Sequence, residues 1–194
     1  MEKEKNESAP KKESGKQTFW ELVRFATLAI LIVIPVRIFI AQPFIVSGSS
    51  MFPTFENGDY LIVDELSYLL GEPERYDVVV FKYPKDTTKF FIKRIIGLPD
   101  ETIDIKGNAV TVTNKEHPEG IHIQQPYVKN NSNNDLHFEL KDGEYFVLGD
   151  NRSASSDSRI WGAVPKKLMS GKVLLRLLPF NDIGIKPGYY KTDN

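Results

Sequence analysis

Cysteine is missing altogether from the 194 residues of this sequence. Its absence excludes disulfide bonds, thiolate zinc sites and a cysteine nucleophile. Histidine is scarce as well, since only His117, His122 and His137 are present, all in one polar stretch. Their spacing is not that of a metal site and no carboxylate cluster accompanies them, so we expect no bound metal.

A large excess of charge of one sign is also missing. The formal net charge is -1, which gives no electrostatic basis for binding nucleic acid. The chain has no internal repeat and no alternation of strands with helices, which argues against a parallel sheet. Beyond the N-terminal segments, roughly 150 residues remain, which is enough for one domain with its own core.

The N-terminal part of the chain changes character at Phe19. Residues 1–18 are dominated by Lys, Glu, Ser and Asn, and such a composition predicts a disordered tail. Residues 19–41 are mainly apolar, with no charge from Phe25 to Val36. That uncharged run is short for a membrane span of ~20 residues, but it becomes long enough if Arg24 and Arg37 reach opposite interfaces.

Three interpretations of residues 19–41 compete. A buried core helix is disfavoured because no amphipathic stripe is visible. A cleaved secretory signal fits the charged start and the apolar middle. We favour a retained anchor, because the run is longer than a typical signal core and Gln42-Pro43-Phe44 follows it in place of a cleavage site with small residues.

The distribution of basic residues predicts the orientation of this anchor. Five lysines and Arg24 precede the middle of the span, whereas no Lys or Arg occurs between Arg37 and Arg75. By the positive-inside rule, the N-terminal tail is cytoplasmic and residues 42–194 are extracytoplasmic.

The rest of the chain has the pattern of a β protein. Short runs rich in β-branched and aromatic residues alternate with turn residues such as Asn57-Gly58-Asp59 and Asp142-Gly143. We expect an antiparallel, barrel-like β domain, with one helical turn at 66–70 and a polar insert near 114–140. The predicted strands are 44–46, 60–63, 77–81, 89–96, 102–105, 109–113, 145–148 and 172–178.

Ser50 and Lys93 are the candidate catalytic residues. A serine hydroxyl is a poor nucleophile until a neighbour removes its proton, and no histidine is close to Ser50 in sequence. Lys93 lies in the apolar run Phe90–Ile96, where burial could make its amine neutral. Serine–lysine pairs are a known alternative to the serine–histidine arrangement. A surface turn for Ser50 and an exposed edge-strand lysine are the plain alternatives.

Four short motifs resemble, in order and spacing, those of type I signal peptidases. The resemblance covers residues 42 to about 180 and includes the preceding anchor. The motifs are Ser50-Met51-Phe52-Pro53-Thr54, then Arg75-Tyr76-Asp77-Val78-Val79-Val80-Phe81, then Lys93-Arg94-Ile95-Ile96-Gly97-Leu98-Pro99-Asp100, and Gly149-Asp150-Asn151-Arg152 with Ser155, Asp157, Ser158 and Arg159.

The resemblance implies a serine endopeptidase that removes N-terminal signal peptides at the bacterial plasma membrane. Its partners would be secretory preproteins and the lipid bilayer, with no cofactor. Ser50 would be the nucleophile, since the Ser-Met-x-Pro-Thr pattern selects it over Ser49, and Lys93 would be the general base. Ser155 would orient the lysine amine.

Other roles follow from the same resemblance. Gly48 replaces a serine found two residues before the nucleophile in some relatives, so the oxyanion would be bound by backbone N–H groups, chiefly that of Ser50. Small side chains at the first and third positions before the cut would enter shallow pockets of Phe44, Val46 and Ile92. Structural ion pairs would involve Arg94, Asp150, Arg152, Asp157 and Arg159.

Two other functions remain open from the sequence. One is a cytoplasmic, self-cleaving serine–lysine protease of the repressor type, which would carry a DNA-binding domain in place of an anchor. The other is a tethered β domain that binds a partner without catalysis. Replacement of Ser50 or Lys93 distinguishes these hypotheses, because an enzyme would lose cleavage whereas a binding domain would keep its affinity for the partner.

Overall fold

The structure, a computed structural model, describes residues 15–39, 41–130, 132–133 and 135–190. Its contacts divide the chain into two units, residues 1–38 and 39–194. The predicted tail lies outside the described residues apart from its last four, 15–18, which begin helix α1 (Gly15–Phe39). The side chain of Arg37, which the anchor prediction uses, also lies outside the described part.

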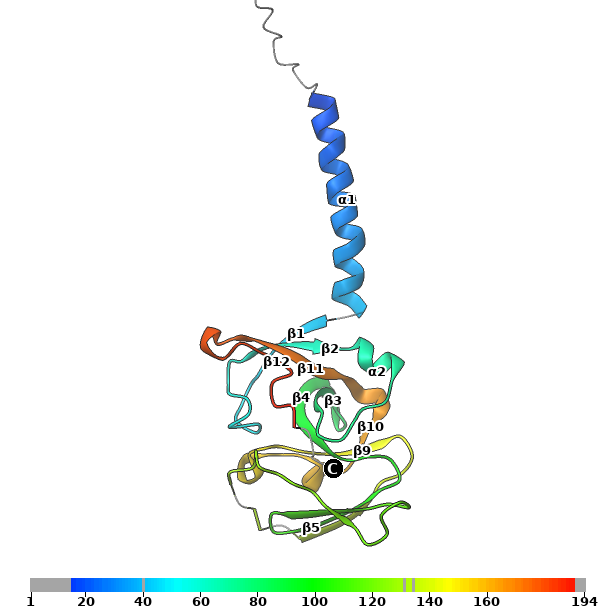
Figure 1. The fold of residues 1–194 in the computed structure, drawn as a ribbon, viewed down its shortest axis with the longest axis vertical. Helices are drawn as coiled ribbons and strands as arrows, with labels where there is room; N and C mark the ends of the chain where they lie inside the picture. The colour runs from blue at the N-terminus through cyan, green and yellow to red at the C-terminus, as the bar shows by residue number, and fades with distance from the viewer. Residues whose placement is uncertain (1–14, 40, 131, 134, 191–194) are drawn as a thin grey trace, which may run out of the picture. The chain divides into compact units, whose positions relative to one another are not determined.

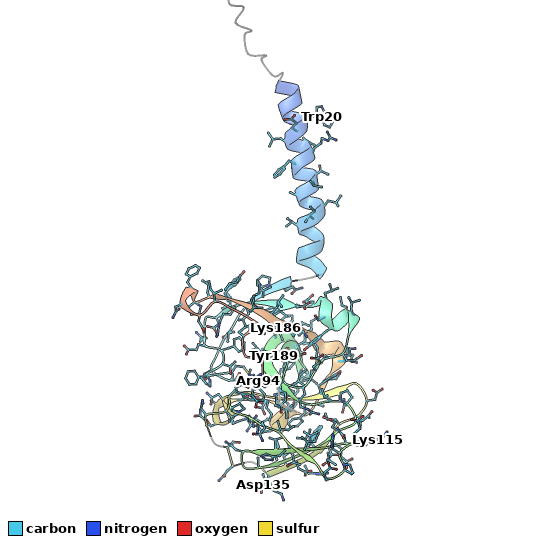
Figure 2. All side chains as sticks on the ribbon, in the orientation of Figure 1. Trp20, Arg94, Lys115, Asp135, Lys186 and Tyr189 are labelled. Atoms are coloured by element: carbon cyan, nitrogen blue, oxygen red, sulfur yellow. The ribbon has the colours of Figure 1, made fainter. Side chains whose placement is uncertain are left out.

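Helix α1 presents apolar side chains to the surroundings over residues 19–33, where its side chains are described (Figure 2). No amphipathic stripe is seen, in line with the sequence. In the part of the chain that the structure describes, no helix has both the length and the apolarity needed to cross a membrane. The exposed apolar side chains are Phe19, Trp20, Leu22, Phe25, Leu28, Ile30, Leu31, Ile32 and Val33.

The second unit consists of two antiparallel sheets (Figure 1). The larger sheet has the strand order β1-β2-β11-β3-β4-β9-β10, with β12 paired to β11. Its strands are β1 (Ala41–Ile45), β2 (Tyr60–Asp64), β3 (Val78–Tyr83), β4 (Asp86–Gly97), β9 (Glu144–Leu148), β10 (Val164–Pro165), β11 (Met169–Leu178) and β12 (Gly184–Ile185).

The smaller sheet has the order β7-β6-β5-β8. In Figure 1 it lies at the opposite end of the unit from β1 and β2. Segment 114–140 adds β7 and β8 to it, and the limits of a polar insert there stay a prediction. Its strands are β5 (Thr102–Lys106), β6 (Ala109–Thr113), β7 (Ile121–His122) and β8 (Asp135–Glu139).

The mainly antiparallel β fold is confirmed, but the expected barrel-like closure is wrong. Among the described strands, neither sheet closes on itself. The strands at the two ends of the larger sheet, β1 and β10, do not pair with each other. Strand β4 leaves a further edge open inside the sheet. It pairs with β3 along nearly its whole length, whereas β9 reaches only Arg94–Gly97. The first half of β4 therefore keeps one unpaired edge.

Short helices complete the unit. The predicted turn at 66–70 is helix α2 (Leu66–Leu70), and α3 (Ser158–Trp161) follows β9. Short 3-10 turns are η1 (Arg152–Ala154), η2 (Lys166–Leu168) and η3 (Phe180–Asp182).

One of the apolar cores supports the loop that follows β1. Met51 and Phe55 from this loop are fully buried beside Leu61 of β2 and Val80 of β3. Phe44 and Ile92 pack on the same cluster and remain partly exposed. Val46 before Ser50 is buried in the same cluster. Burial on both sides of Ser50 fixes the loop, because each such apolar side chain stabilises its buried position by ~1.5–3 kcal/mol.

Candidate active site

The structure brings Ser50 and Lys93 together. Ser50 lies on the loop between β1 and β2, and Lys93 lies in β4, opposite Val79 of β3. The Lys93 amine donates hydrogen bonds to Ser50 Oγ at 2.7 Å and to the backbone oxygen of Ile92 at 2.8 Å. Only 4% of the Lys93 residue is exposed, so the hydroxyl of Ser50 has a buried amine as its neighbour.

Burial changes the protonation of this amine. Loss of hydration lowers the pKa of Lys93 to about 8, against the opposing charges of Asp157 and Asp150. Removal of water destabilises the ammonium form, which is the charged one. At neutral pH a useful fraction of Lys93 is therefore the neutral amine that a serine nucleophile requires as a base.

Asn151 holds the Ser50 loop in place. Its backbone N–H donates to Ser50 O at 3.0 Å, and its side-chain amide donates to Ser49 O at 3.0 Å. From the sequence, Asn151 has no predicted role beyond its place in a motif. Its position directly after Asp150 was the only available signal, because the partner backbone lies a hundred residues earlier in the chain.

Gly149 permits the close approach of two loops. A Cβ atom there would lie 2.5 Å from Ser50 O and would also collide with the side chain of Ser155. A separation of this size is never found for real Cβ atoms, so any larger residue would displace the Ser50 loop. Gly149 is thus a second site residue that the sequence did not single out.

Ser155 lies at this meeting point. Its Oγ is buried and has no hydrogen-bond partner among the described residues. The Lys93 amine donates its hydrogen bonds to Ser50 Oγ and Ile92 O. The predicted hydrogen bond between Ser155 and the Lys93 amine therefore stays a prediction. A buried hydroxyl without a partner is rare, and its position beside Gly149 leaves it available to a ligand or to water.

A buried ion pair connects the strand of Lys93 to the loop after β9. Arg94 Nη2 lies 2.6 Å from Asp150 Oδ2, and both side chains are almost completely inaccessible. Thr54, four residues after Ser50, donates to the same carboxylate at 2.5 Å. Arg94 also donates to Gly188 O at 2.6 Å, and Figure 2 shows it beside the C-terminal segment. Arg94 and Asp150, two of the residues expected in structural ion pairs, thus pair with each other.

The remaining charged residues brace the loop of Ser155. Asp157 pairs with Arg159 at 2.7 Å and accepts a hydrogen bond from Gly149 N at 3.0 Å. Arg152 was expected in an ion pair, but its guanidinium donates instead to Gly149 O at 3.0 Å and to the Gln125 side chain. The oxygen atoms within hydrogen-bond distance of the Arg152 guanidinium are neutral, so it forms hydrogen bonds and no ion pair.

Gly48 is less available for an oxyanion than the sequence suggested. Its N–H donates to Asn57 Oδ1 at 2.9 Å, so this amide is already engaged. Its φ of +96° is in a region that favours glycine. The Ser50 N–H has no hydrogen-bond partner in the described part of the chain, which leaves it as the free donor at this site.

A cleft of about 510 Å³ leads to Ser50 and Lys93. The three predicted pocket residues, Phe44, Val46 and Ile92, all line it. Leu61 and Val80 add to its apolar walls. A cleft of this size is large enough for several residues of an extended peptide, and apolar walls favour uncharged side chains.

A serine and a buried lysine at hydrogen-bond distance, in an apolar cleft, define a serine hydrolase of the serine–lysine class. The comparison with protein families then identifies the group. The chain belongs to the family described as signal peptidase, peptidase S26, whose model matches residues 19–178.

Individual relatives agree with the family. The chain is 36% identical over 186 residues to "Probable signal peptidase I-2" of Synechocystis sp., covering 92% of this chain and 83% of the relative. It is 31% identical to signal peptidase I of Bacillus amyloliquefaciens, covering 94% and 96%. A crystal structure of a signal peptidase I from Enterococcus faecalis is 29% identical with a TM-score of 0.44, covering 52% of this chain and 96% of that one.

Gly149→Ala tests the meeting of the two loops. The added methyl group would push the Ser50 backbone away, and a displacement of about 1 Å costs roughly a hundredfold in rate. We expect such a loss in kcat for a peptide with Ala at the first and third positions before the cut. Gly184→Ala is the control, since a Cβ there has nothing within 4 Å. Equal activity of the two variants would contradict the prediction.

Lys93→Met tests the burial of the amine. The pKa of Lys93 is about 8 in the folded protein and 10.5 ordinarily, so the folded state resists protonation. The buried ammonium therefore lowers the stability of the folded protein. This destabilisation is fully present below pH 8 and disappears as the pH rises to 10.5. We expect the variant to be up to roughly 3 kcal/mol more stable at pH 7 in urea unfolding, and less so at pH 10. Lys89→Met, at an exposed position of the same strand, should show no such pH dependence.

Proposed function

We propose that this chain is a serine endopeptidase that removes N-terminal signal peptides from exported preproteins, with Ser50 as nucleophile and Lys93 as general base. The observation that carries the proposal is the 2.7 Å contact between the buried Lys93 amine and Ser50 Oγ. Membership of the signal peptidase family gives the substrate class.

In the acylation step, the neutral amine of Lys93 accepts the proton of the Ser50 hydroxyl. Ser50 Oγ then bonds to the carbonyl carbon of the scissile peptide. When the C–N bond breaks, the Lys93 ammonium returns its proton to the leaving amine, which departs as the new N-terminus of the mature protein. One group thus serves as base and then as acid.

Deacylation uses the same amine. Lys93 accepts a proton from a water molecule, and the hydroxide attacks the ester between Ser50 and the signal peptide. The ester C–O bond breaks, the proton returns to Ser50 Oγ, and the signal peptide leaves with a free carboxylate. In both steps we assign the oxyanion to the Ser50 N–H, since the amide of Gly48 is engaged by Asn57.

Ser155 has a supporting role in this proposal. Its buried, unpartnered Oγ is suited to hydrogen-bond the Lys93 amine or the attacking water once a substrate closes the cleft. Asp157 and Arg159 hold the loop that carries it. Ser155 is therefore a positioning residue, because it acts through Lys93.

The cleft supports a preference for small residues. A substrate strand added along the free edge of β1 would place its side chains alternately toward and away from Phe44 and Val46. The side chains of the first and third residues before the cut would point to the same side of the substrate strand, toward Ile92, Phe44 and Val46. We propose that only small side chains fit there, as in an Ala-x-Ala sequence.

Replacement of the two central residues tests the function. Ser50→Ala and Lys93→Ala should each lose more than ~10³ of the rate of cleavage of an Ala-x-Ala preprotein, measured with full-length protein in detergent. Lys141→Ala, at an exposed lysine that does not line the cleft, is the control. If the wild type cleaves nothing and both variants bind the preprotein as the wild type does, the chain is a tethered binding domain. Normal cleavage by Lys93→Ala would exclude Lys93 as the base.

The pH dependence of the wild-type reaction belongs to the same test. The base must be neutral, and the pKa of Lys93 is about 8. Below that pH, kcat/KM should rise about tenfold per pH unit, and above it the rate should level off. A rate that does not change between pH 6 and 9 would require a different base.

We further propose that residues 19–41 anchor the chain in the bacterial plasma membrane as a single span. Residues 1–18 would form a disordered cytoplasmic tail, and residues 42–194 the extracytoplasmic catalytic domain. The support is the apolar run and the basic residues before it. The outward-facing Phe25 and Leu31 fit contact with lipid.

Leu28→Lys combined with Leu31→Lys tests the anchor. A lysine at the centre of a span costs ~2.5–3.5 kcal/mol, so the double variant should move from the membrane fraction to the carbonate-extractable fraction. Phe19→Lys, at the cytoplasmic end, is the control. In spheroplasts, an external protease should remove a C-terminal tag and spare an N-terminal one. The opposite pattern of tag loss would reverse the orientation.

A further inference from the structure

A second cavity of about 400 Å³ adjoins the catalytic cleft. Phe90 of β4 lines both hollows. The ring of Phe90 contacts that of Phe44 in the catalytic cleft, with centroids 5.4 Å apart. The proposed catalytic mechanism uses none of the other residues that line the second cavity, which are Gln42, Glu65, Tyr68, Leu69, Lys82, Lys167, Leu168, Met169 and Ser170.

The same strands build the two hollows, on the same face. On β1, Phe44 lines the catalytic cleft and Gln42 lines the second cavity. On β3, Val80 lines the cleft and Lys82 the cavity. Each pair is two residues apart, and residues so spaced in a strand point to the same side of the sheet. The second cavity therefore continues the concave face of the cleft away from Ser50.

A third segment shows the same continuation. Leu61 of β2 lines the cleft, and Glu65, just after the end of β2, lines the second cavity. Val63 between them is fully buried and belongs to the same face by alternation. An extended peptide that leaves Ser50 along β1 therefore meets a continuous wall as far as Gln42.

The length of this wall determines which substrate residues reach the second cavity. Strand residues advance ~3.3 Å each, so Gln42 is ~13 Å from Val46 along β1. If the third residue before the cut lies near Phe44 or Val46, the cavity receives residues roughly two to four positions further upstream. In a signal peptide this is where the apolar segment ends and the polar cleavage region begins.

The lining of the cavity fits such a boundary. Leu69 of α2 is 69% exposed and Phe90 is 46% exposed, so both present apolar surface that a ligand can cover. Met169 adds a flexible thioether side chain, which adapts to partners of different shape. Lys82 and Lys167 provide charged groups at the same hollow. Aliphatic side chains of varied shape can therefore enter, while the polar groups meet the peptide backbone.

We propose that this second cavity is a specificity subsite for an aliphatic side chain at the end of the substrate's apolar segment, upstream of the small residues at the cut. The inference rests on the proposed function, since it needs a peptide bound along β1 with its N-terminal side toward Gln42. It assigns Leu69, Phe90 and Met169 as the residues that read this position.

Leu69→Ser is the main test, because the residue is exposed and its replacement does not disturb the core. Two synthetic peptides share an Ala-x-Ala cut site and carry either Leu or Ser at each of the fifth, sixth and seventh positions before the cut. The full-length wild type in detergent micelles should cleave the Leu peptide with a kcat/KM roughly fivefold to tenfold higher, mainly through KM. Leu69→Ser should reduce that ratio to about twofold or less.

Leu70→Ser is the matched control. Leu70 is the next residue of α2 and is 81% exposed, but it does not line the cavity. The Leu70→Ser variant should keep the wild-type ratio of kcat/KM between the Leu peptide and the Ser peptide. The rate on the Ser peptide should be the same for all three proteins, which shows that the catalytic pair is intact.

Several results would overturn the proposal. A wild-type ratio near one means that the cavity does not read the substrate. An equal loss of the ratio in both serine variants means that α2 acts without this cavity. Lower binding of Leu69→Ser to lipid vesicles, with an unchanged peptide ratio, identifies a lipid chain as the occupant. If neither peptide is cut, the proposed function fails first and the subsite fails with it.

Discussion

The arrangement of this site depends on one physical constraint, which is that a lysine amine must remain dry beside a serine hydroxyl. The apolar cluster that contains Met51, Phe55 and Val80 removes water from the cleft floor, and burial lowers the pKa of Lys93. Two carboxylates, Asp150 and Asp157, act in the opposite direction. Each is paired with an arginine, Arg94 or Arg159, so a nearby positive charge offsets much of its attraction for an ammonium. The ion pairs thus protect the neutral amine as well as the loops.

The same constraint explains why glycine and asparagine occur where the loops meet. Ser50 must approach the end of β9 closely, and Gly149 is the point at which no Cβ can be accommodated. Asn151 then donates hydrogen bonds to the carbonyl oxygens of both Ser49 and Ser50. Rigid positioning of the nucleophile reduces the entropy that must be lost during the reaction. Tight packing near Ser50 is accordingly a requirement of the chemistry and not only of stability.

The sequence was a good guide to those features that local patterns encode. All eight predicted strands occur, with ends shifted by up to three residues, and the turn at 66–70 is helix α2. Ser50 and Lys93 meet as their motifs required. Features that depend on partners distant in the chain were not readable. The contact of Arg152 with Gln125 and the close approach of Ser50 to Gly149 join loops that meet only after folding. The bonds from Gly48 to Asn57 and from Arg152 to Gly149 form within single loops, whose irregular conformation no sequence pattern encodes.

The open form of the larger sheet, which the sequence did not predict, follows from the function. A closed sheet would pair β1 with another strand, and the backbone groups of its edge would no longer be open to a substrate. Because β9 pairs only with Arg94–Gly97, the residues before Lys93 keep a free edge, as β1 does at the end of the strand order. Free edges invite aggregation, and charges near them reduce that risk. Asp86 and Lys89, which pair with each other at 2.9 Å, supply such charges on β4. The edge can therefore stay open without promoting aggregation, which suits the extended substrate of the proposed function.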